Sequence, residues 1–201
     1  MAGCYNSPCL IKQHIDYFIM VKILWAIRAM LYNLLGVRVG FLSYIGKPLF
    51  IHNRGHILIG SRVRIFPSAR LETHNKGIIK IANNVAIGQN FHITASSGEL
   101  CIGEDTTISG NVFVTNIDHD YKEINKHIMD QRMIIRNTKI GRNCFIGYGA
   151  AIQAGTILGD QCIVGTNSVV RGIFPDKCVI VGAPARIVRK YNVDSEVWEK
   201  V

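Results

Sequence analysis

A histidine between two acids, in the segment Thr115–Tyr121, is the strongest candidate for chemistry in this chain of 201 residues. Imidazole has an unperturbed pKa of about 6.5, so His119 is suited to accept a proton near neutral pH. Asp118 or Asp120 could orient the ring or raise its basicity, as base-orienting partners do in other sites. The alternative is a solvated loop histidine that happens to lie between two acids. The elements around the segment must distinguish these two interpretations.

Those elements follow a strict period of six. Aliphatic residues recur at Ile140, Ile146, Ile152, Leu158, Val164 and Val170. Small residues precede them by two positions, at Thr138, Cys144, Ala150, Thr156, Cys162 and Ser168. A helix would space its apolar residues three and four apart, and a plain strand would space them two apart. The period therefore predicts a hexapeptide repeat that winds a parallel β-helix.

Three hexapeptides make one triangular coil, and the inward aliphatic residues stack about 4.8 Å apart along the axis. Interrupted repeats over residues 59–71, 81–93 and 102–114 extend the pattern backwards. We therefore expect an all-β chain of about five to six coils, with Ile180 starting the last. The step from Val114 to Ile140 is too long for one hexad, and its protruding loop carries His119. The alternative is a β-sandwich with a chance period, although sandwich strands usually recur every 8–12 residues.

Composition favours a folded domain with anionic partners. Hydrophobic residues make up 48% of the chain and charged residues 18%, which argues against disorder. A net charge of +9 is suited to a phosphate-bearing cofactor, an acidic membrane surface or nucleic acid. The spread of the basic residues, without a helix-turn-helix or zinc-finger pattern, argues against nucleic acid. Cys144 and Cys162 fill small inward slots, and no paired metal spacing or secretory cleavage signal occurs, so we expect a reduced cytoplasmic protein.

The segment Ile15–Leu35 is rich in large apolar residues and resembles a membrane span in length. Lys22, Arg28 and Asn33 interrupt it, and charges inside a span are costly. On a single helix Lys22 and Arg28 would lie on different faces, which argues against one clean amphipathic helix. Two interpretations stay open. One is two short helices packed on the base of the β-helix or on a neighbouring subunit; the other is peripheral membrane contact through residues 15–35.

The expected organisation has three parts. Residues 1–50 form a helical apolar segment, residues 51–190 form the β-helix with a loop at 115–137, and residues 191–201 form a C-terminal tail.

The repeat from Ile140 to Val170, followed by Pro175 and the Gly-Ala-Pro-Ala-Arg element at 182–186, resembles the hexapeptide-repeat acyltransferases. It is most similar to sugar O-acetyltransferases of the galactoside, maltose and polysaccharide-modifying type, over roughly residues 55 to 190. This resemblance implies a left-handed parallel β-helix, a departure from the usual right-handed crossover. It also implies a homotrimer with active sites between adjacent subunits, acetyl-CoA as donor, a hydroxyl acceptor and no metal.

The same resemblance assigns roles to residues near the loop. His119 matches the family's general base, which takes the acceptor proton while the acceptor oxygen attacks the thioester directly. Asn90 and Asp118 are the candidates for acceptor binding, although Asn90 could equally be a corner residue with left-handed dihedral angles. Ser96 and Ser97 stand near the place where relatives carry an acid, which leaves the acceptor's identity open.

The cofactor-binding role is carried over to aromatic, hydroxyl and basic residues of the C-terminal third. These are Phe145, Tyr148, Thr166, Arg171, Arg186 and Arg189. Phe145 stands where relatives often have tryptophan and would line the pantetheine path. Arg186 and Arg189 would bind the CoA phosphates through forked hydrogen bonds, and the alternative is a solvated basic tail. Arg171-Gly172 replaces the Thr-Lys pair of many relatives, which moves the positive charge by one residue.

Two other functions use the same scaffold. A γ-carbonic-anhydrase-like enzyme would need three histidines around zinc, and His92, His119 and His127 are the set near the coils. Their spacing departs from the His-x-x-x-x-His of that class. A non-catalytic assembly protein would need neither the loop histidine nor a basic CoA-binding end. The apolar N-terminal segment favours a surface polysaccharide or lipid-linked glycan as the acceptor.

Overall fold

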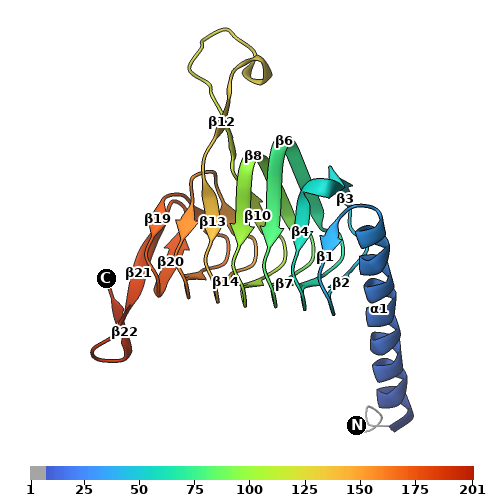
Figure 1. Cartoon of the computed structure of the whole chain (residues 1–201). Coiled ribbons are helices and arrows are strands. Elements are labelled where there is room, and N and C mark those ends of the chain that lie inside the picture. The colour runs from blue at the N-terminus through green and yellow to red at the C-terminus, as the bar shows by residue number, and fades with distance from the viewer. Residues whose placement is uncertain (1–7) are drawn as a thin grey trace, which may run out of the picture.

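The computed structural model describes residues 8–201, with side chains from residue 19 onward. The chain forms a left-handed parallel β-helix of about six triangular coils, as the sequence predicts. One helix, α1 (Pro8–Leu34), lies at the N-terminal end of the coil stack, and a hairpin projects from one edge of it (Figure 1). Within residues 8–201, no helix has the length and apolar character needed to cross a membrane.

Each coil contributes one strand to each of three faces. The first face contains β2 (Tyr44–Ile45), β5 (Arg64–Ile65), β7 (Ala86–Ile87), β9 (Thr107–Ile108), β14 (Phe145–Ile146), β17 (Ile163–Val164) and β20 (Cys178–Gly182). The second face contains β3 (Phe50–His52), the first halves of β6 (Arg70–Ile81) and β8 (His92–Ile102), β10 (Phe113–Thr115), β15 (Ala151–Ile152) and β18 (Val169–Val170). The third face contains β1 (Arg38–Val39), β4 (Ile57–Ile59), the second halves of β6 and β8, β13 (Thr138–Ile140), β16 (Ile157–Leu158) and β19 (Ile173–Phe174).

The remaining elements lie outside the repeat. The hairpin consists of β11 (Ile117–His119) and β12 (Met133–Ile135), with the short helix η2 (Ile128–Asp130) near its tip and η1 (Arg54–His56) at a corner of the first coils. At the C-terminal end, β20 continues into β21 (Ala185–Asn192) and β22 (Val197–Lys200), which add two antiparallel strands to the first face. The expected tail after residue 190 therefore contains a strand.

The inward residues stack in register from coil to coil. On the first face, for example, Ile45, Ile65, Ile87 and Ile108 lie above one another and are at most 2% exposed. Burying one such side chain contributes about 1.5–3 kcal/mol, and a coil gains this only when a neighbour covers it. The aliphatic period thus produces one continuous core column along each face.

The β-helix begins earlier than residue 51, where the sequence interpretation placed its start. Strands β1, β2 and β3 pair in parallel with the coil that follows, so the first coil starts at Arg38. Val39, Ile45 and Ile51 already stand six apart there, with Ser43 in the small slot. The neighbouring apolar residues of this segment masked the period.

Helix α1 is one continuous helix, so the expectation of two short helices was wrong. Its C-terminal half packs on the first coil, where Ala29 is 3% exposed. Arg28 Nη1 donates to the carbonyl oxygen of Ile45 at 3.1 Å, and Lys22 Nζ lies 6.0 Å from the centre of the Tyr44 ring. Because both cations have partners on the first coil, neither of them breaks the helix.

Glycines allow the coils to approach at the corner between the third and first faces. A Cβ atom on Gly141 would lie 2.3 Å from the carbonyl oxygen of Gly159, which belongs to the next coil. We expect Gly141→Ala to lower the free energy of unfolding by about 1–3 kcal/mol, because rigid backbone rather than a side chain must move. Urea unfolding measures this loss. Gly55→Ala is the matched control, since no atom lies within 4 Å of its added Cβ, and an equal effect of both changes would contradict the prediction.

Candidate active site

The hairpin leaves the coil stack at the edge between the second and third faces, which we term the hairpin edge (Figure 1). Its root is held by Asn116, which is 2% exposed. The Asn116 side chain accepts from the Ser96 backbone N–H at 2.8 Å and donates to the Ser96 carbonyl at 2.9 Å. This amide therefore takes the place of a strand residue, and the hairpin starts from a fixed point on the rigid scaffold.

His119 is the last residue of β11, opposite Met133 of β12. Its side chain is half-buried, and its Nδ1 atom is buried without a hydrogen-bond partner among the described residues. A buried polar atom without a partner is costly, so such an atom suggests a ligand or a second chain at this place. The imidazole thus stands at the hairpin root with a nitrogen available for chemistry.

The two neighbouring acids are engaged elsewhere. Asp118 accepts from its neighbour's backbone, the His119 N–H, at 3.0 Å and from Arg171 Nη2 at 2.9 Å. Asp120 accepts from the Lys122 backbone N–H at 3.2 Å. Asp118 therefore ties the hairpin root to the coil that carries Arg171. This acid positions the backbone of His119 rather than its ring.

Asn90 lies at a different edge, between the first and second faces, which we term the ladder edge. Its φ angle of 56° is in the left-handed region, and its Nδ2 donates to Asn111 Oδ1 at 2.9 Å. Asn111 in turn donates to the Tyr148 hydroxyl, and the Asn167 N–H donates to the Tyr148 carbonyl at 2.8 Å. Asn90 thus has the geometry of a corner residue and also belongs to a polar ladder.

The predicted cofactor residues are divided between several places. Tyr148 and Thr166 lie along the ladder edge, next to Asn90 in successive coils. Phe145 is 46% exposed on the first face, in register with Thr107 and Ile163 of the adjacent coils.

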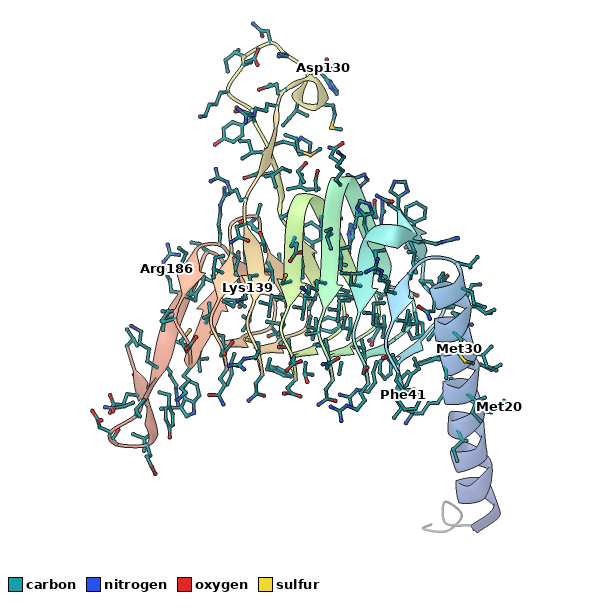
Figure 2. All side chains as sticks on the ribbon, viewed as in Figure 1. Met20, Met30, Phe41, Asp130, Lys139 and Arg186 are labelled. Atoms are coloured by element: carbon teal, nitrogen blue, oxygen red, sulfur yellow. The ribbon has the colours of Figure 1, made fainter. Side chains whose placement is uncertain are left out.

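The two C-terminal arginines lie further along the stack. Arg186 and Arg189 are exposed on β21, opposite Val181 and Val179 of β20. Figure 2 shows Arg186 near the C-terminal end of the stack, far from Met20 and Met30 of α1. Both guanidinium groups therefore belong to the end of the prism that is remote from α1.

One chain does not bring the predicted site together. His119, Asp118 and Arg171 gather at the hairpin edge, whereas Asn90, Tyr148 and Thr166 occupy the ladder edge. The second face of the prism separates the two edges.

A cluster around Glu72 on the second face was not found from the sequence. The Glu72 carboxylate, in a side chain that is 9% exposed, accepts from Arg70 Nε. It also lies 3.3 Å from His92 Nε2 and 3.6 Å from His74 Nε2. Burial raises the pKa of Glu72, but the hydrogen bond and charge of Arg70 outweigh it, so the net shift is downward. Outward-facing polar residues on alternate positions from Arg70 to His74 were the available signal.

The three histidines considered for zinc are not gathered. Burial and the charge of Arg70 lower the pKa of His92, which faces Glu72. His127 caps η2 by accepting from the Met129 N–H at 3.2 Å in the loop beyond the hairpin. Among the residues with described side chains, no three His, Cys, Asp or Glu are placed to hold a metal ion.

Comparisons with known proteins agree with this geometry. The family described as bacterial transferase hexapeptide (six repeats) matches residues 137–172. A putative lipopolysaccharide biosynthesis O-acetyl transferase, WbbJ of Escherichia coli K12, is 35% identical over 160 residues, which cover 76% of this chain and 81% of that protein. Galactoside O-acetyltransferase of the same organism is 28% identical over 116 residues, 55% of this chain and 56% of the relative.

Solved structures share the fold. AntD, an N-acyltransferase from Bacillus cereus in complex with dTDP and coenzyme A, superposes with a TM-score of 0.67 at 20% identity, covering 81% of this chain and 89% of that one. Galactoside acetyltransferase in complex with coenzyme A gives a TM-score of 0.57 at 21% identity, covering 87% and 76%. The coil repeat and the match to WbbJ over most of both sequences thus lead to one conclusion: the chain belongs to the hexapeptide-repeat acyltransferase family.

Proposed function

We propose that the protein transfers an acetyl group from acetyl-CoA to a sugar hydroxyl, in a surface polysaccharide or a lipid-linked glycan. The observation that carries the proposal is His119, half-buried at a fixed hairpin root with an unpartnered ring nitrogen. The names of the relatives support the acceptor class, because one is a putative lipopolysaccharide O-acetyl transferase and another a galactoside O-acetyltransferase.

In the proposed reaction His119 takes the proton of the acceptor hydroxyl as that oxygen attacks the thioester carbonyl. The new C–O ester bond forms and the C–S bond of acetyl-CoA breaks. The CoA sulfur leaves as thiolate and receives the proton back from the imidazolium. Each turnover therefore releases one free thiol, and no acyl-enzyme is formed.

The active site of this proposal lies between copies of the chain in a homotrimer. A heterologous interface that joins the hairpin edge of one copy to the ladder edge of the next closes into a ring. That contact would place His119 near the Tyr148 and Asn90 of a neighbouring copy, which a single chain cannot do. Light scattering is expected to give the mass of three chains.

The test of the proposed function is thiol release from acetyl-CoA in the presence of a panel of sugars. Release that depends on a sugar acceptor is expected, with an acetyl ester found on that sugar by mass spectrometry. CoA binding without any acceptor-dependent release would instead favour a non-catalytic scaffold.

Arg186→Ala is expected to raise the KM for acetyl-CoA about ten- to hundredfold with little change in kcat. The guanidinium would bind a CoA phosphate, and a hydrogen bond to a charged group contributes about 1.5–3 kcal/mol. Initial rates at varied acetyl-CoA measure the effect, which should shrink as salt is added. Lys139→Ala removes an exposed cation from the third face and is the control. Equal KM values for the two variants would assign Arg186 to a solvated basic strand.

A further inference from the structure

Helix α1 turns its charges toward the protein rather than toward solvent. Arg28 binds the Ile45 carbonyl and Lys22 lies against the Tyr44 ring, both on the first coil. Trp25 packs on the same side, with ring centroids 5.9 Å from Tyr44 and 5.4 Å from Phe66. The polar residues of the helix are thus used on its inner side.

The outer side is apolar without interruption. Nine residues between positions 19 and 35 are 44–83% exposed, and all of them are Ile, Leu or Met. They are Ile19, Met20, Ile23, Leu24, Ile27, Met30, Leu31, Leu34 and Leu35. At about 100° per residue they occupy an arc of about 160° that contains no polar residue. We term this arc the outer face of α1, and Figure 2 labels two of its members, Met20 and Met30.

The adjoining corner of the first coil continues this apolar surface. Phe41 and Leu42 are 78% and 66% exposed, and together with α1 they line a groove of about 450 Å³. Leu42 has a φ of 55°, a conformation that suits asparagine or glycine far better than leucine. A large apolar side chain is therefore presented to the outside at a position where a polar one would fit the backbone.

The same end of the prism is strongly basic. Residues 17–71 contain eight Lys or Arg and no Asp or Glu, so they carry +8 of the chain's formal +9. Exposed members lie in the first two coils, next to α1: Arg38, Lys47, Arg54 and Arg62. An extended apolar face beside a basic surface is the pattern of helices that lie in the interface of an anionic bilayer.

A second copy of the chain fits this surface less well. Face-to-face pairing would cover the outer face of α1, but it would bring together two like-charged ends. A bilayer with anionic headgroups satisfies both the apolar face and the basic coils. We propose that the outer face of α1 and the Phe41–Leu42 corner seat this end of the prism in the surface of an anionic lipid bilayer.

The seat sets the height of the chemistry above the membrane. Four coils separate the α1 end from the hairpin root, and at about 4.8 Å per coil this is about 19 Å. His119 would stand above the headgroups, at the level of the sugars of a membrane-borne glycan. This consequence rests on the proposed function, whereas the docking itself does not.

Co-sedimentation of the full chain with vesicles tests the docking. Binding to phosphatidylcholine vesicles that contain phosphatidylglycerol is expected to exceed binding to phosphatidylcholine alone by at least tenfold, and to weaken with salt. The double variant Ile23→Glu/Ile27→Glu should lose at least tenfold of that binding. Ile173→Glu, which changes an 81% exposed residue on β19, should bind as the unaltered protein does.

Leu42→Asn provides a second, independent variant, because asparagine tolerates the positive φ at this corner and should weaken binding without disturbing the fold. Thiol release with a soluble sugar should be unchanged in all variants, so a failure of docking and a failure of the proposed function are distinguishable. Equal sedimentation with and without anionic lipid would overturn the proposal. So would vesicle binding that survives both changes, or a fall in lipid-free mass on Ile23→Glu/Ile27→Glu, which would assign the face to contacts between copies.

Discussion

Replacing His119 with alanine is expected to lower kcat for acetyl transfer about 10²- to 10⁴-fold, the usual contribution of a positioned general base. A neutral sugar hydroxyl is a poor nucleophile, and no other imidazole is placed at the hairpin root among the described residues. The KM for acetyl-CoA should change little, because the predicted donor residues lie on other parts of the prism. Thiol release at saturating acetyl-CoA and acceptor measures the loss.

The matched control is His127→Ala, which removes an exposed imidazole from the same protruding loop. Its kcat should stay close to that of the unaltered protein. Urea unfolding midpoints of both variants should coincide, since neither ring belongs to the core column. Full activity of His119→Ala would remove the general-base role and leave this residue as a solvated loop histidine.

Phe91→Ala is expected to lower the free energy of unfolding by about 3–5 kcal/mol. Phe91 is fully buried inside the prism, beside the ladder-edge corner at Asn90. Its carbonyl accepts from the Arg70 N–H at 2.8 Å, and its coil is paired on both sides. The stacked coils are held at a fixed spacing by these ladders, so the cavity cannot collapse. The midpoint of urea unfolding should fall while the m-value stays constant.

Phe41→Ala removes the same ring from a position that is 78% exposed, and its unfolding midpoint should move by no more than about 0.5 kcal/mol. Comparable losses for the two phenylalanines would mean that the ring of Phe91 does not fill the interior as the structure places it. A lower m-value for Phe91→Ala would instead point to partial unfolding of the coils nearest to it.

The periodic pattern alone determined the coil, its inward residues and the place of the loop. From Ile140 to Val170 each inward residue is separated from the next by the same six positions, so side-chain direction follows from local geometry. Cys144 and Cys162 were expected in small inward slots and are buried there. The first coil at residues 38–52 was missed because its inward residues stand among other apolar residues, and periodicity is visible only against polar positions.

Only the tertiary structure decided which residues share an edge. Arg171 and Asp118 are far apart in sequence yet form an ion pair, and Glu72 meets His92 from the adjacent coil. Spacing along the chain tells whether a side chain points inward or outward, but the partner of an outward side chain depends on how coils stack and where corners insert extra residues. The direction of Lys22 and Arg28 was undecided for the same reason. A helix presents every face, and only its packing on the first coil determines which face is left to solvent.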